Sequence, residues 1–137
     1  MNAAFFLKPK SEVIYLHSDM PLAEALEELY RRGYTSVPVI DREGKYICSV
    51  SEGDFLRALA RIEDGHILLS DAATAEMHVL GDILRKDRNP SCHIDVPVEE
   101  LLQRTAAQNF VPIVDDRGIF IGIVTRRTVI HHFLKQA

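Results

Sequence analysis

The feature that most constrains the fold of this chain is an internal repeat. Shifting the sequence by 74 residues places 37–44, which reads VPVIDREG, on 111–118, which reads VPIVDDRG. The register continues without a gap as far as 55–56 and 129–130. Upstream of these segments the match returns at an offset of 76, so the second copy is two residues shorter. Two copies of one unit must therefore pack as two halves of a 137-residue chain.

Each copy is predicted to run in the order strand, helix, strand, strand, helix. The first helix has apolar residues at helical spacing, which predicts one buried face. In the first copy these residues are Leu22, Ala25, Leu26, Leu29 and Tyr30, and in the second Val98, Leu101, Leu102, Thr105 and Ala106. Pro21 and Pro97 suit the start of a helix, and Asp19 and Asp95 are predicted to cap the two helices.

A hairpin and a closing helix complete each copy. Gly44 and Gly118 end four-residue turns between runs rich in β-branched and aromatic residues, where a positive φ angle is wanted. Closing helices are predicted at 52–60 and 126–135, with apolar residues on one face. The fold class is therefore α/β, or α+β, with two βαββα repeats packed as a pseudo-two-fold pair. We expect the first repeat at 8–60, a connector at 61–78 with a short helix at 71–77, and the second repeat at 79–135.

Composition excludes several classes of protein. With 47% apolar and 26% charged residues the chain is expected to be globular, and a net charge of −4 argues against nucleic-acid binding. The longest apolar runs are far shorter than a membrane helix, so we expect a cytoplasmic protein that does not bind a membrane. Cys48 and Cys92 lack metal or redox spacing and are predicted to be free thiols. Catalytic motifs and metal-ligand spacings are absent, so no catalytic or metal residue is assigned and the chain is not expected to be an enzyme.

Two sets of motifs resemble the CBS domain, named after cystathionine β-synthase. The first copy has GYTSVPVID at 33–41, then Gly44 and VSEGD at 50–54, and the second has NFVPIVD at 109–115, then Gly118 and IVTRR at 123–127. The resemblance implies a Bateman module that binds adenine nucleotides in clefts between its copies and pairs as a homodimer. Within the family the chain is similar to stand-alone bacterial proteins that bind cyclic di-AMP or AMP.

The resemblance implies a favoured cleft that joins the turn of the first copy to the last helix of the second. Its residues are Val13, Ile14, Tyr34, Thr35, Ser36, Val37, Pro38, Ile123, Thr125, Arg126, Arg127 and Thr128. Arg126 and Arg127 open a helix, where free N–H groups, the helix dipole and guanidinium groups favour phosphate. Thr128 stands where the family usually has an aspartate that binds ribose.

A second cleft is ranked lower. Its residues are Val50, Ser51, Asp54, His93, Asn109, Phe110 and Val111. Asp54 is present, but the two-residue deletion removes the counterpart of the Gly-Tyr-Thr turn. Glu52 also stands where a phosphate would lie, so an anion would meet a like charge.

Structural roles remain open for several of these residues. Ser51 and Asp54 also form a helix capping box, and Thr35 and Ser36 can simply satisfy backbone groups at the entry of a strand. The sequence therefore favours a sensor that needs no cofactor, takes an adenine nucleotide as effector and acts in trans on an unknown effector protein. The alternative is a structural or protein-interaction CBS dimer that binds no nucleotide.

Overall fold

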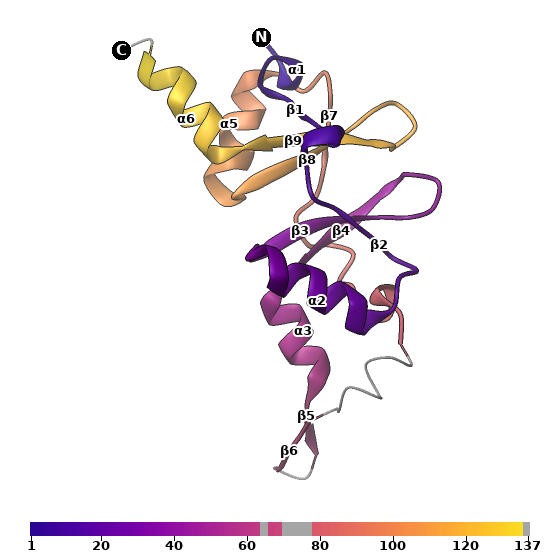
Figure 1. Cartoon of the computed structure of the whole chain (residues 1–137). Helices are drawn as coiled ribbons and strands as arrows, with labels where there is room; N and C mark the ends of the chain where they lie inside the picture. The colour runs from indigo at the N-terminus through magenta and orange to yellow at the C-terminus, as the bar shows by residue number, and fades with distance from the viewer. Residues whose placement is uncertain (64–65, 70–77, 136–137) are drawn as a thin grey trace. The chain divides into compact units, whose positions relative to one another are not determined.

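The computed structural model describes residues 1–63, 66–69 and 78–135, which form two compact units (Figure 1). Unit 1 comprises 1–14, 43–46 and 89–137, and unit 2 comprises 15–42 and 47–88. The first repeat lies largely in unit 2 and the second in unit 1. Each unit contains a small sheet with helices packed against it.

Unit 2 contains the three-stranded sheet β2-β3-β4, whose strands are β2 (Leu16–His17), β3 (Ser36–Ile40) and β4 (Tyr46–Ser51). Its helices are α2 (Leu22–Arg32) and α3 (Glu52–Leu59). Strands β2 and β3 run parallel, with Leu16 opposite Val39. Apolar side chains from both helices and the sheet are buried, among them Leu22, Ala25, Leu29, Val37, Val39 and Phe55.

Unit 1 contains the four-stranded sheet β1-β9-β8-β7, whose strands are β1 (Lys8–Pro9), β7 (Cys92–His93), β8 (Phe110–Val114) and β9 (Phe120–Thr125). Helices α1 (Ala3–Phe6), α5 (Val98–Ala107) and α6 (Arg126–Lys135) and the 3₁₀ turn η1 (Lys10–Glu12) complete it. Its core includes Ala3, Phe6, Cys92, Leu101, Val111, Ile113, Val124 and Val129.

Equivalent contacts in the two units confirm the βαββα repeat. Leu16 pairs with Val39 in unit 2, and Cys92 pairs with Ile113 in unit 1, which reproduces the offsets of 76 and 74 seen in the sequence. The N–H of Glu52 donates to the carbonyl of Thr35, and the N–H of Arg126 donates to that of Asn109 at the equivalent place. The predicted fold class is therefore correct.

The two-residue deletion falls at the end of the second repeat's first helix. Helix α2 ends at Gly33, which adopts the left-handed conformation with φ 71° and leads into the Gly-Tyr-Thr turn. Helix α5 instead ends at Gln108, whose backbone is extended, and Asn109 leads directly into β8. The second copy therefore has no left-handed cap and no counterpart of that turn.

The chain from the end of the first repeat to the start of the second contains further elements. Strands β5 (Ala60–Glu63) and β6 (His66–Leu69) pair antiparallel, and the 3₁₀ turn η2 (Leu80–Ile83) packs against α3. The connector was predicted as mixed, and the hairpin within it was not foreseen. The short helix predicted at 71–77 lies outside the described residues.

Several local expectations were wrong. Asp19 pairs with Arg42, and Pro21 and Pro97 occupy the N-cap positions of α2 and α5 without a side-chain hydrogen bond. Tyr30, predicted on the buried face of α2, is 85% exposed. Further apolar residues predicted on buried helix faces are also exposed, namely Leu56, Leu102, Ala106, Ile130, Phe133 and Leu134.

The first nine residues add two elements that the repeat did not predict. Helix α1 begins after Asn2, whose side chain accepts from the N–H of Ala4, and buries Phe6 in the core of unit 1. Strand β1 then pairs antiparallel with β9, with Pro9 opposite Gly122. Gly122 has φ 154°, and a Cβ atom there would lie 2.2 Å from the carbonyl oxygen of Lys8. Glycine is therefore required for β1 to reach β9.

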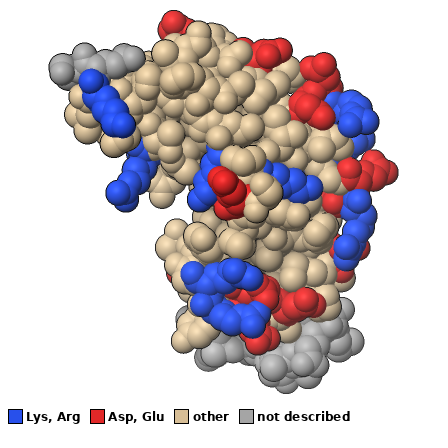
Figure 2. Space-filling view, turned by 45° about the horizontal axis from the view of Figure 1, so that its top comes forward, with Lys and Arg blue, Asp and Glu red and all other residues tan. Residues whose placement is uncertain are grey.

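The charged side chains are mixed in sign. Figure 2 shows basic and acidic residues lying next to one another over the face drawn, with no wide area of one sign. None of the helices in the described part of the chain has the length and apolar character needed to cross a membrane.

Candidate functional site

The start of helix α6 brings together the polar residues predicted for the favoured cleft in unit 1. Strand β9 ends at Thr125, and α6 begins at Arg126 without an acidic residue in its first turn. The Oγ1 atoms of Thr125 and Thr128 lie 2.7 Å apart, and the N–H of Thr128 donates to Thr125 Oγ1 at 3.1 Å. Thr125 is therefore the side-chain cap of the helix, and it satisfies one free N–H group.

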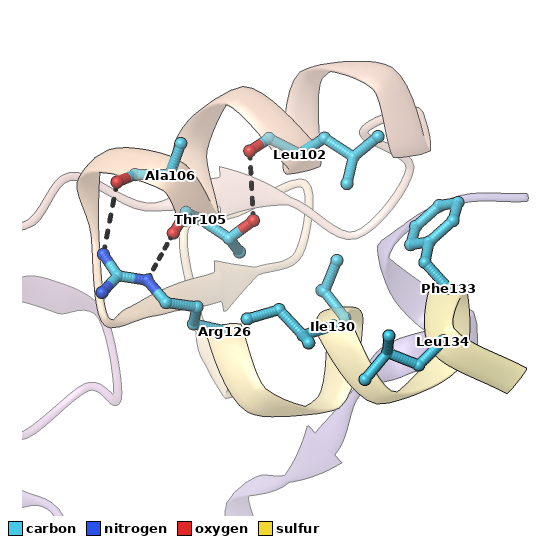
Figure 3. Close-up of a pocket in the computed structure, with 8 residues that line it drawn as sticks. Leu102, Thr105, Ala106, Arg126, Ile130, Phe133 and Leu134 are labelled. Atoms are coloured by element: carbon cyan, nitrogen blue, oxygen red, sulfur yellow. Dashed lines mark hydrogen bonds between the residues drawn. The ribbon is translucent and has the colours of Figure 1, made fainter. Parts of the chain in front are cut away.

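Arg126 is held by the neighbouring helix. Its Nε atom donates to the carbonyl of Thr105 at 2.7 Å, and its Nη2 atom donates to that of Ala106 at 3.3 Å (Figure 3). These carbonyls belong to the last turn of α5, where backbone oxygens lack partners within the helix and the dipole favours a cation. The guanidinium of Arg126 thus ties the end of α5 to the start of α6.

Arg127 differs from its neighbour. Its side chain is exposed and makes no hydrogen bond or ion pair with any residue that the structure describes. It borders a pocket of about 610 Å³ whose other lining residues are Asn109, Thr125, Arg126, Ile130, His131 and Leu134. A cation in the first turn of a helix is unfavourable unless an anion accompanies it. Of the two arginines, Arg127 is therefore the one available to a ligand.

The remaining unit 1 residues of the favoured cleft lie along the opening segment and β9. Turn η1 packs against β9 and leads into Val13 and Ile14, which are both half-buried. Ile123 lies on β9 opposite Lys8. The segment of Val13 and Ile14 therefore approaches the strand that ends at Thr125.

The first copy's half of the favoured cleft lies in unit 2. Tyr34 and Thr35 are exposed, and the Thr35 carbonyl accepts from the N–H of Glu52 at 3.1 Å. Ser36 is half-buried, whereas the side chains of Val37 and Pro38 are buried in the unit's own core. Tyr34, Thr35 and Ser36 can thus present side chains, while Val37 and Pro38 can present backbone. The cleft as a whole stays a prediction.

In the second cleft, both carboxylate oxygens of Asp54 already accept hydrogen bonds from other residues of the protein. One oxygen accepts from the N–H of Ser51 at 2.8 Å and from its hydroxyl at 3.1 Å, and the Asp54 N–H donates back to that hydroxyl. The other oxygen lies within reach of Arg57, Arg85 and Arg88. The capping box weighed as a structural role is therefore present, with Val50 buried beside it.

Burial and hydrogen bonding act on Asp54 in opposite directions. Burial of the carboxyl group raises its pKa, but the hydrogen bonds from the Ser51 backbone and Arg57 outweigh burial and hold the pKa below its usual value. Asp54 is therefore an anion at neutral pH. Glu52 and Asp54 were predicted here from the sequence, but Arg57, Arg85 and Arg88 were not.

The other residues of the second cleft belong to unit 1. His93 Nε2 lies 2.5 Å from Asp116 Oδ1, and its Nδ1 accepts from the N–H of Asp95. Asn109 is exposed, Phe110 is half-buried and Val111 is fully buried. The side chain of Val111 packs in the core, so it can offer a ligand only its backbone.

An apolar groove lies between α5 and α6. Figure 3 shows Leu102 on α5 facing Ile130, Phe133 and Leu134 on α6 across a pocket of about 620 Å³. Among these residues Ile130 is 52% and Leu134 is 69% exposed. The described parts of the chain contain no cluster of three or more histidine, cysteine or acidic residues that could hold a metal ion.

The fold and these turns define a tandem pair of α/β repeats. The family model described as the CBS domain matches residues 7–61 and 80–135, which is more than half of the chain. The chain therefore belongs to the CBS domain family, and the resemblance drawn from the motifs is confirmed. Among curated proteins, it is 26% identical over 131 residues to cyclic di-AMP receptor B of Bacillus subtilis, covering 96% of this chain and 85% of that protein.

Other relatives are much longer than this chain. It is 25% identical over 118 residues to L-aspartate semialdehyde sulfurtransferase of Methanocaldococcus jannaschii, covering 85% of this chain but 20% of that enzyme. Because the match covers a fifth of the enzyme, it indicates shared CBS repeats.

Solved structures share the fold over nearly the whole chain. A hypothetical conserved protein from Geobacillus kaustophilus has a TM-score of 0.85 at 25% identity, covering 100% of this chain and 98% of that one. CbpB of Listeria monocytogenes in complex with cyclic di-AMP has a TM-score of 0.83 at 24% identity, covering 98% and 96%. CBSX2 in complex with AMP has a TM-score of 0.74 at 23% identity, covering 98% and 97%.

Proposed function

We propose that this chain is a regulatory module that binds an adenine nucleotide, with cyclic di-AMP as the first candidate, and acts in trans on a partner protein. The observation that carries the proposal is Arg127, an exposed arginine without a partner among the described residues, in the first turn of α6 beside a pocket. The similarity to cyclic di-AMP receptor B and to structures with cyclic di-AMP and AMP supports this ligand class.

In the proposed site, phosphate binds Arg127 and the free N–H groups at the start of α6. Thr125 and Thr128 supply hydroxyls. The base lies against Val13 and Ile14. The Gly-Tyr-Thr turn of the first copy stays a predicted ligand-binding element. The two copies are taken to span 8–60 and 79–135, with 61–78 as connector. The module is proposed to need no cofactor and to catalyse no reaction.

Isothermal titration with cyclic di-AMP, AMP, ADP and ATP tests the proposal. At least one nucleotide should bind, and Arg127→Ala should weaken that binding at least tenfold. Arg117→Ala is the matched control, because it removes an arginine with an 80% exposed side chain from the same unit, in the turn before β9 and so at the other end of that strand from α6. Absence of binding by all four nucleotides, or equal binding by Arg127→Ala and the wild type, would contradict the proposal.

The groove between α5 and α6 favours a second role as a homodimer contact. Its apolar lining on two adjacent helices is the kind of surface that a partner usually covers. A second copy would bury Leu102, Ile130, Phe133 and Leu134 against the same helices. Persistence of the dimer without any nucleotide binding would favour the structural CBS dimer.

Sedimentation velocity tests the groove. Leu102→Glu places a charge in it and should shift the protein toward monomer, whereas Gln103→Glu, at the next exposed position of α5, should leave the oligomeric state unchanged. A wild-type monomer, or a dimer that Leu102→Glu does not weaken, would contradict this contact.

A further inference from the structure

Three arginines from two segments of unit 2 converge on one carboxylate oxygen. Arg57, on α3, places Nη2 2.6 Å from Asp54 Oδ1. Arg85 and Arg88, which follow η2, each place Nη2 3.4 Å from the same oxygen. Arg85 and Arg88 lie 28 and 31 residues after Arg57 in the sequence, so only the fold brings the three arginines together.

The cluster has unused donors and excess positive charge. The Asp54 side chain is 5% exposed, whereas those of Arg57, Arg85 and Arg88 are 56%, 51% and 43% exposed. Each guanidinium has five N–H donors in a planar fork, and the contact with Asp54 engages one nitrogen of each. Three cations share one carboxylate, so the cluster has two positive charges in excess. Lys86 and Asp87, between the two arginines, cancel one another.

The start of α3 lies beside the same cluster. The guanidinium of Arg57 folds back over Gly53, and Nη1 is 3.2 Å from the place a Cβ atom would take there. The positive end of the helix dipole is directed toward this turn. Glu52 opens the helix and is exposed, outside the hydrogen bonds of the cluster. The local charges therefore favour an anion despite Glu52.

We propose that Arg57, Arg85 and Arg88 form a phosphate site, with Asp54 as the buried anchor that holds the three guanidinium groups together. The excess of two charges over Asp54, with Glu52 outside the hydrogen bonds of the cluster, matches a phosphate monoester or inorganic phosphate, which carries about 1.5 to 2 negative charges slightly above pH 7. A phosphodiester carries one charge per phosphate and matches less well. The site uses unit 2 alone and a ligand without a base, so it does not rest on the proposed function.

Titration with inorganic phosphate at constant ionic strength tests the site. Saturable binding should appear in the wild type, and Arg85→Ala plus Arg88→Ala should weaken it at least tenfold. The matched control is Arg31→Ala plus Arg32→Ala, which removes two arginines paired with Glu28 on α2. This control should bind phosphate as the wild type does.

Two further variants keep the result decisive. If the double variant fails to fold, Arg57→Ala, the most exposed of the three, should still weaken phosphate binding several-fold. Arg117→Ala, which removes an exposed arginine of unit 1 outside both proposed sites, should leave phosphate binding unchanged. A wild-type response no larger than that to chloride, equal loss in the Arg31 and Arg32 control, or loss in Arg117→Ala would overturn the proposal.

Discussion

Arg126 donates from Nε to the carbonyl oxygen of Thr105 at 2.7 Å, so the first residue of one helix closes the end of another. The arginine beside it, Arg127, makes no such bond among the described residues. Two adjacent residues of the same type therefore have different physical roles, one structural and one available to a ligand.

Arg126→Ala should lower the free energy of unfolding by about 1 kcal/mol, because two carbonyls at the end of α5 lose a charged donor. Urea denaturation measures this loss. Arg127→Ala is the control and should change stability by less than about 0.5 kcal/mol, as expected for an exposed side chain. Equal effects of the two substitutions would contradict the distinction.

Gly122→Ala should destabilise the protein by about 2 kcal/mol or more. The added Cβ would lie 2.2 Å from the Lys8 carbonyl oxygen and would adopt a φ angle of 154° that alanine rarely takes. Gly118→Ala is the matched control, because Gly118 has φ 81° but no atom within 4 Å of the added carbon. It should cost about 1 kcal/mol, from the left-handed backbone alone. A Gly122→Ala protein as stable as the control would show that β1 does not bind there.

The sequence predicts the repeated core well because its signals are local. Gly44 and Gly118 adopt the positive φ angles that their turns need, and the offsets of 74 and 76 reappear as strand register. Strand β1 has two residues and no periodicity, and it pairs with a strand more than 100 residues away. Its one signal was Gly122, at the position where the first copy has Cys48 on an edge strand.

Only part of the candidate site was predicted, again because the signals in the sequence are local. Arginines at the start of a helix were visible in the sequence, but the contact that holds Arg126 comes from Thr105, on a different helix. Arg85 and Arg88 lie in a segment without helical or strand periodicity, so only the folded chain brings them to Asp54.

The stabilising effect of Asp54 should disappear in acid. The pKa of Asp54 is lower in the folded protein than in the unfolded chain, where it is about 3.9. The contribution of Asp54 to stability is therefore complete above the pKa of the unfolded chain, and it is lost as the pH falls through the pKa of the folded protein. The wild type should exceed Asp54→Asn in free energy of unfolding at pH 7, and the difference should shrink below about pH 4. A difference that does not change with pH would contradict this.

Cys48 should not react with a thiol reagent at pH 8 while the protein is folded. Burial raises its pKa to about 11, so almost no thiolate is present, and the side chain is fully buried. The thiol of Cys48 ionises near pH 9 in the unfolded chain but only near pH 11 in the folded protein. Its contribution to stability is therefore lost between about pH 9 and 11. A colorimetric thiol assay with and without denaturant measures both cysteines. Fast reaction of the folded Cys92→Ser variant would contradict this prediction.

Thr128→Asp should stabilise helix α6 by about 0.5 to 1 kcal/mol, because it recreates at Thr125 the capping box that Asp54 forms with Ser51. The carboxylate would also place a negative charge in a first turn that now holds two arginines and no acid. Thr128→Asn, which lacks the charge, should give a smaller gain. Urea denaturation at pH 7 and pH 3 separates the two, since protonation of the new carboxylate removes the advantage of aspartate over asparagine. An aspartate variant that is less stable than the asparagine variant at pH 7 would show that the two helix starts are not equivalent.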